Sequence, residues 1–179
     1  MPKIVVNGTL YMIAGINNSN TMAIESVPLQ TLYTKGNNNS STLCNTSIIT
    51  PSYITTIATD LTSSGIMPIY AANGNIYTVY YSTSGYVKLL TFNTATNGVS
   101  VKQLLQVPNN ILGFAIVNGN VYVSSVQGNT LTVYKFDLNG NSITSQSYPG
   151  IGFVDMNGYV IQFTNGLNSG STINVYQPL

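Results

Sequence analysis

The chain has 179 residues, of which 44% are hydrophobic and 5% are charged, and its formal net charge is +1. Globular chains usually carry about 25% charged residues. A net charge near zero excludes electrostatic steering toward nucleic acid or an anionic membrane. The low charge together with ordinary hydrophobicity excludes a disordered chain, and the length suffices for one domain with its own core. We therefore expect a single domain over residues 1–179.

The N-terminal stretch gives no sign of export. Asn7-Gly8-Thr9 interrupts its apolar residues, so no signal peptide is recognised. No apolar run approaches the about 18 residues of a transmembrane helix, which predicts no membrane insertion. The single cysteine, Cys44, excludes an internal disulfide.

Residues 4–15 read IVVNGTLYMIAG and predict a β-hairpin. Asn and Gly adopt the positive φ angles that two-residue hairpin turns require, and β-branched and aromatic residues on both sides suit strands. The next region, residues 30–64, is dense in Asn, Ser and Thr. It predicts a long exposed loop followed by a strand, or a loop-rich insertion in the first structural unit.

Two four-stranded antiparallel meanders follow. Each has a short apolar first strand that ends at Asn-Gly-Asn, a second strand with Tyr, a third strand, and a more polar fourth strand. The predicted strands are residues 65–72, 76–81, 86–93 and 99–106 in one meander, and 111–117, 121–126, 131–137 and 142–149 in the next. Helical periodicity is absent.

An Asn-Gly turn recurs along the chain at Asn7, Asn73, Asn118 and Asn157, at spacings of 66, 45 and 39 residues. The last two spacings lie in the range of propeller blades. The fourth copy, residues 154–177, has three strands, so a closed ring needs that blade completed from elsewhere.

These units resemble the blades of β-propellers, in particular the loose pattern of quinoprotein-like propellers, over about residues 64–177. The resemblance is one of topology. The Trp that marks many quinoprotein and WD-type blades is absent, so the resemblance implies no cofactor. It implies an all-β fold, a small β-propeller of about four blades. The alternative is a β-sandwich built from the same hairpins.

Tyrosine is the most prominent candidate for binding. Tyr77 and Tyr81 should share one face of their strand, and Tyr80 should take the other. Tyrosine suits protein interfaces and, beside Asn, sugar hydroxyls. The alternative is cross-strand packing within the sheets. The predicted binding residues are Tyr77, Tyr80, Tyr81, Tyr86, Tyr122 and Tyr134.

Two further motifs have competing interpretations. Asn-X-Ser/Thr sequons predict glycosylation at Asn17, Asn38, Asn39 or Asn45, although a chain rich in Asn, Ser and Thr also produces sequons by chance. Asp137–Asn141 reads DLNGN and has the alternating oxygens of a calcium loop, but real calcium loops contain more carboxylates. A hairpin turn capped by Asp and Asn explains it better, and we predict no metal site.

Catalysis has few candidates. The absence of histidine excludes Ser-His and Cys-His nucleophile systems, and one cysteine with four scattered acids argues against zinc. A glycosidase needs two carboxylates about 5–9 Å apart, and no pattern pairs Asp60 with Asp155. We expect a protein that is not an enzyme and has no cofactor. The alternative is a carbohydrate-binding or hydrolytic propeller that uses Asp60, Asp137 or Asp155.

The Asn-, Ser-, Thr- and Tyr-rich, charge-poor composition is similar to that of surface and virion proteins of acidothermophilic archaea and their viruses. This similarity implies a structural or host-attachment component of a virion. Its partners would be other protein subunits, or a host receptor or glycan, and its location the virion or the extracellular surface. The alternative is a cell-surface adhesin or pilus-like subunit. With so few carboxylates, stability should change little between about pH 3 and pH 7.

Overall fold

The computed structural model describes residues 1–15, 20–31, 51–62, 67–107, 111–164 and 170–179. The described strands form four antiparallel sheets, and the chain divides into two compact units, Met1–Thr59 and Asp60–Leu179. The expectation of one domain over 1–179 stays a prediction. No helix in the described ranges has the length and apolarity to cross a membrane.

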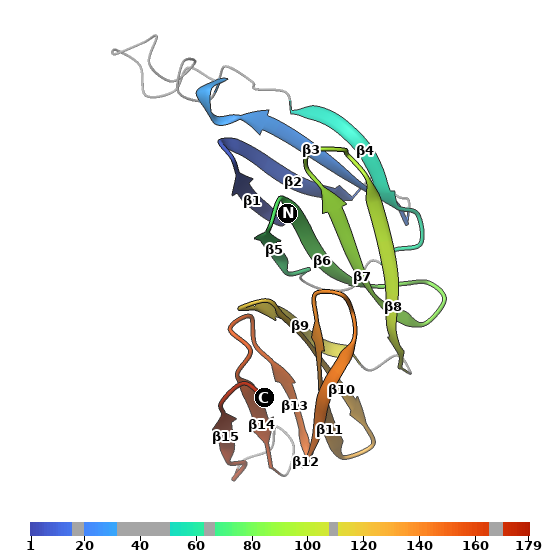
Figure 1. The fold of residues 1–179 in the computed structure, drawn as a ribbon. Helices are drawn as coiled ribbons and strands as arrows, with labels where there is room; N and C mark the ends of the chain where they lie inside the picture. The colour runs from blue at the N-terminus through green and yellow to red at the C-terminus, as the bar shows by residue number, and fades with distance from the viewer. Residues whose placement is uncertain (16–19, 32–50, 63–66, 108–110, 165–169) are drawn as a thin grey trace. The chain divides into compact units, whose positions relative to one another are not determined.

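The first unit holds one sheet, with strand order β1-β2-β3-β4 (Figure 1). The predicted hairpin at Asn7-Gly8 is present, with φ angles of 48° and 75°. β4 lies inside the region 30–64, but residues 32–50 are outside the described residues, so a loop or insertion there stays a prediction. The strands are β1 (Lys3–Val6), β2 (Thr9–Gly15), β3 (Met22–Pro28) and β4 (Ser52–Ala58).

The second unit holds three sheets, each a meander of consecutive strands. The first is β5 (Ile69–Ala72), β6 (Asn75–Tyr81), β7 (Tyr86–Asn93) and β8 (Val99–Gln106). The next is β9 (Ile111–Val117), β10 (Asn120–Gln127), β11 (Thr130–Asp137) and β12 (Ser142–Pro149). The last has three strands, β13 (Ile151–Val154), β14 (Val160–Phe163) and β15 (Ile173–Tyr176). The two predicted four-stranded meanders are confirmed.

The hairpin turns follow two designs. Asn73-Gly74 and Asn118-Gly119 have φ angles of 51° and 73°, and of 49° and 75°. Positive φ at both central residues is the type I′ turn that the Asn-Gly pairs predict. The fourth copy differs, because a longer turn closes on the Asp155 carboxylate, which accepts hydrogen bonds from the backbone N–H groups of Asn157 and Tyr159, both at 2.9 Å. Only Gly158 of that Asn-Gly pair has positive φ, at 85°.

Neighbouring sheets of the second unit share apolar cores. The core between the sheets β5–β8 and β9–β12 is formed by residues such as Val79, Leu89, Val121 and Phe136. The core between β9–β12 and β13–β15 includes Leu131, Val133, Val154 and Val160. Alternation of inward apolar and outward polar residues along each strand produces these packed faces.

Polar contacts also connect neighbouring sheets. Ser124 Oγ donates to the Gly113 carbonyl at 3.3 Å and accepts from the Val154 N–H at 3.0 Å, which ties β9 and β10 to β13. Lys102 Nζ of β8 donates to the Asn139 carbonyl at 2.7 Å, in the turn between β11 and β12. The sheets of this unit are therefore joined by backbone, side-chain and apolar contacts.

Candidate functional site

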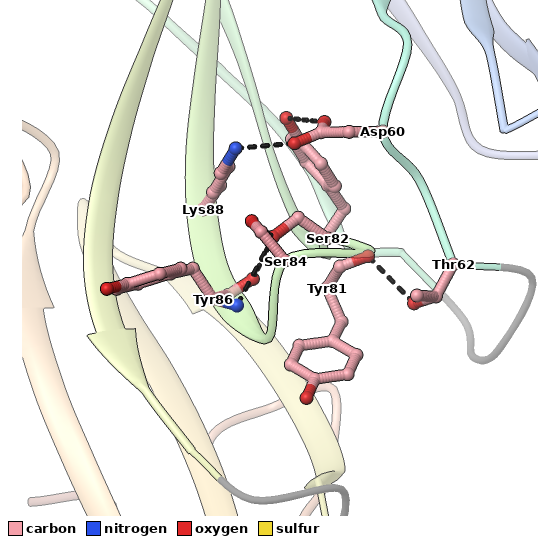
Figure 2. Close-up of polar contacts among 8 residues, drawn as sticks. Asp60, Thr62, Tyr81, Ser82, Ser84, Tyr86 and Lys88 are labelled. Atoms are coloured by element: carbon pink, nitrogen blue, oxygen red, sulfur yellow. Dashed lines mark hydrogen bonds and ion pairs between the residues drawn. The ribbon is translucent and has the colours of Figure 1, made fainter.

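The densest polar cluster of the second unit lies where residues 60–62 run beside the end of β6 (Figure 2). Leu61 pairs with Ser82 in an isolated antiparallel bridge. Thr62 donates to the Tyr81 carbonyl from its N–H at 2.9 Å and from Oγ1 at 2.8 Å. These contacts hold the segment against the hairpin β6–β7 and position Asp60.

Asp60 forms an ion pair with Lys88 of β7. Lys88 Nζ lies 2.5 Å from Oδ2, and the Tyr80 hydroxyl donates to Oδ1 at 3.0 Å. Tyr80 and Lys88 are direct cross-strand partners, so the hairpin register alone brings both donors to one place. The Lys88 and Asp60 side chains are 14% and 31% exposed.

The electrostatics of this cluster favour a fixed charge distribution. Burial works to raise the pKa of Asp60, but the hydrogen bonds from Lys88 and Tyr80 and the Lys88 charge lower it further, so the pKa lies below its ordinary value. Burial and the bond to Asp60 raise the pKa of Tyr80 far above its ordinary value. Near neutral pH, Asp60 is therefore ionised and Tyr80 protonated, and neither is suited to exchange a proton with a substrate.

The neighbouring serines stabilise the turn rather than offer a nucleophile. Ser82 Oγ donates to the Tyr86 carbonyl at 3.0 Å, accepts from the Tyr86 N–H at 3.2 Å, and lies 2.9 Å from Ser84 Oγ. Ser82 is fully buried. Its hydroxyl therefore satisfies backbone groups that would otherwise be unpaired.

The structure buries three of the six tyrosines predicted to bind a ligand. Tyr77, Tyr80 and Tyr122 are 8%, 1% and 4% exposed. As expected from the alternation, Tyr77 and Tyr81 contact the same core, and Tyr80 reaches Asp60 instead. For the buried three, packing within the sheets is the correct interpretation, and a direct role in binding at the surface is not.

The other three tyrosines, Tyr81, Tyr86 and Tyr134, are half-buried. The Tyr81 hydroxyl donates to the Val107 carbonyl at 3.2 Å, and the Tyr134 ring packs against the core between two sheets. Figure 2 shows the Tyr86 side chain pointing away from the ion pair. For these three, a binding role stays a prediction.

The predicted glycosylation sites Asn17, Asn38, Asn39 and Asn45 all lie outside the described residues, and glycosylation there stays a prediction.

The DLNGN segment has the hydrogen bonds of a capped turn. Asp137 Oδ1 accepts from the N–H groups of Asn139 and Asn141 at 2.9 and 2.8 Å, and Oδ2 accepts from the Asn141 side chain at 2.9 Å. The backbone bond from Asn141 is the largest cause of a lowered Asp137 pKa. Within the described ranges, no group of three or more His, Cys, Asp or Glu residues could hold a metal.

Gln162 is a buried polar residue that the pattern analysis missed. It is 1% exposed on β14. Its amide donates to the Pro149 carbonyl, and its Oε1 accepts from Asn174 Nδ2 at 2.8 Å and from the Tyr176 hydroxyl at 3.1 Å. Alternation with the buried Val160 was the available signal that this side chain points inward.

The accessible surface of the second unit is poor in charge. β8 is exposed along most of its length and β12 along all but one residue. Their accessible side chains are Ser, Thr and Gln with apolar Val99, Val101 and Ile143, which are 38%, 45% and 51% exposed. The one charged side chain on these strands, Lys102, is bonded to the neighbouring turn.

No protein-family model matches the sequence, and no curated protein matches it. Solved structures do. The β-propeller domain of the Trilobed protease from Pyrococcus furiosus, described as having an open velcro topology, matches 98% of this chain at a TM-score of 0.57 and 12% identity. Prolyl oligopeptidase B from Galerina marginata matches 95% of it at a TM-score of 0.53 and 10% identity.

The chain spans 52% of the length of the first of these proteins and 23% of the second. At such low identity the likeness concerns the fold, and the peptidase activities belong to those proteins. The four antiparallel meanders and their match to propeller domains settle the choice between the two predicted architectures: the chain has a β-propeller fold, and the β-sandwich alternative is wrong.

Proposed function

We propose that this protein is a non-enzymatic structural or binding subunit exposed outside the cell, as a virion component. The observation that carries the proposal is the nearly uncharged, Ser-, Thr- and Gln-rich surface of the exposed strands β8 and β12. Such a surface has few charges to desolvate when another subunit packs against it.

The acids of the second unit support a role without catalysis. Asp60 is engaged by Lys88 and Tyr80, and Asp137 and Asp155 each cap a turn through backbone N–H groups. A hydrolytic propeller would need a carboxylate pair with pKa values adjusted for acid–base work. If an activity is found, Asp→Asn variants at these three positions should leave it unchanged.

Exposure to acid is part of the proposal. A protein with four acidic residues gains few positive charges when its carboxylates are protonated, so it avoids the self-repulsion that unfolds many proteins in acid. A virion subunit can be assembled inside the cell and meet acid afterwards.

The test is location. The protein should be quantified by mass spectrometry in density-purified extracellular particles, culture supernatant and washed cells of its source. Enrichment in particles together with a capsid protein is expected. Enrichment on washed cells would favour the adhesin or pilus-like alternative, and presence only in the soluble cytoplasm would refute both.

A further inference from the structure

The three-stranded sheet ends in a strand with the geometry of an inner one. In the three four-stranded sheets, the second and third strands pair without irregularity, whereas the third and fourth strands pair with a register shift. β15 pairs with β14 without any shift, as a third strand does. In the other sheets such a strand has neighbours on both sides, but no described strand pairs with the outer side of β15 (Figure 1).

The outer side of β15 presents unpaired backbone groups. The Thr164 N–H donates to the Thr172 carbonyl at 3.0 Å. Backbone groups alternate sides along an antiparallel strand, so Thr172, Asn174 and Tyr176 turn theirs to β14. Ile173 and Val175 therefore turn their N–H and C=O groups away from the sheet. Their apolar side chains are 60% and 61% exposed.

This edge lacks the usual protections against strand addition, which are charge, bulges and coverage. Residues 170–179 contain no charged side chain. The edge is nevertheless held in place, because Asn174 and Tyr176 bond to the buried Gln162, and the Tyr176 ring lies 4.7 Å from that of Tyr148. An ordered strand can accept a partner at a low entropic cost.

We infer that β15 docks the β15 strand of a second copy of this chain, antiparallel and around a two-fold axis. Such pairing is self-complementary when Asn174 faces its own copy. Ile173 then lies opposite Val175, and these are the residues whose backbone groups point outward and can exchange hydrogen bonds. Thr172 lies opposite Tyr176, so apolar residues meet apolar ones and polar residues meet residues that carry hydroxyls.

The pairing would join two three-stranded sheets into one of six strands. A contact of four residues per strand is small, so the dimer should be weak in dilute solution and populated at the high local concentration of an assembly. Because no charge lies on this edge, association should not depend on salt. The inference names a partner for the proposed structural role and rests on it for its biological purpose.

The test is a concentration series of the full chain by sedimentation or light scattering. The wild type should shift from monomer toward dimer, Val175→Lys should remain monomeric with an unchanged melting temperature, and Ile173→Lys should do the same. Ile143→Lys is the matched control, because it adds the same charge to an exposed apolar position on β12, and it should dimerise like the wild type. A wild type that stays monomeric throughout, or a Val175→Lys variant that associates as the wild type does, would overturn the inference.

The register has its own test. Asn174→Cys in a Cys44→Ser background should form a disulfide-linked dimer on mild oxidation, because the two-fold register places the two introduced thiols opposite each other. Dimerisation of the wild type without this cross-link would show that the register is wrong. Both experiments use purified protein, so they can fail while the protein is still found in particles, and they can succeed while it is not.

Discussion

At the scale of single residues, the few charges of this chain serve local structure. Asp60 neutralises Lys88, and Lys135 Nζ donates to the Leu179 carbonyl at 2.5 Å while lying 5.7 Å from the centre of the Tyr122 ring. In a protein with 5% charged residues, each such group has a defined partner rather than a solvated, interchangeable position. Single substitutions at these groups should therefore have measurable effects.

Asp60→Asn should lower the free energy of unfolding by about 1–3 kcal/mol, because it leaves the largely buried Lys88 ammonium without its counter-ion. Lys88→Met removes the charge but keeps the packed stem, so the double variant should be more stable than the sum of the two single effects predicts. Urea denaturation of the four proteins measures this coupling. Strictly additive effects would mean that the pair does not contribute to stability.

Gln162→Leu should cost about 1–3 kcal/mol although the two side chains are similar in size. The substitution leaves the Pro149 carbonyl and the Asn174 amide without their partner in a buried site. Gln177→Leu makes the same chemical change at an exposed position and should be close to neutral. Equal melting temperatures for the two variants would contradict the assigned role of Gln162.

At the scale of elements, the repeat is regular in its hairpins and irregular where sheets meet. Asn-Gly turns set the register of β5–β6 and β9–β10, while the contact between β9 and β13 depends on a glycine. A Cβ atom on Gly113 would lie 2.4 Å from the Val154 carbonyl oxygen, which is closer than real Cβ contacts come. Neighbouring sheets can approach this closely only because position 113 has no side chain.

Gly113→Ala should therefore destabilise the protein by about 1–3 kcal/mol, since backbone rather than a flexible side chain must move. Gly15→Ala is the control, because a Cβ there meets nothing within 4 Å and φ is not positive. It should be neutral or slightly stabilising, as a restriction of the unfolded chain. Thermal unfolding followed by circular dichroism compares the two, and a Gly113→Ala variant as stable as the control would refute the close approach.

At the scale of the whole molecule, stability should depend little on pH. The pKa values of Asp60 and Asp137 are lowered on folding, so their contribution is present above the ordinary aspartate pKa and is lost as the pH falls through the lowered values. The melting temperature should therefore be constant between pH 7 and about pH 4.5, and should decline only below about pH 4. Asp60→Asn should flatten that decline, and a fall of many degrees between pH 7 and pH 5 would contradict this account.

The sequence alone determined the local architecture of the protein. Asn-Gly pairs between apolar runs identified the hairpins at Asn7, Asn73 and Asn118, because turn geometry and strand alternation are properties of neighbouring residues. The same reasoning placed Tyr77 and Tyr80 on opposite faces and recognised DLNGN as a capped turn. The turn at Asn157 deviated because Asp155, two residues upstream, offered the backbone a better acceptor.

Only the tertiary structure decided which faces are covered and which distant residues meet. Alternation assigns a side chain to one face of a strand, but burial of Tyr77 and Tyr122 depends on the sheets packed against them. The ion pair of Asp60 with Lys88 joins residues 28 positions apart, and no local pattern predicts that contact. The open side of β15 likewise became apparent only once every other described strand had its neighbours, because pairing between strands is a property of the folded chain.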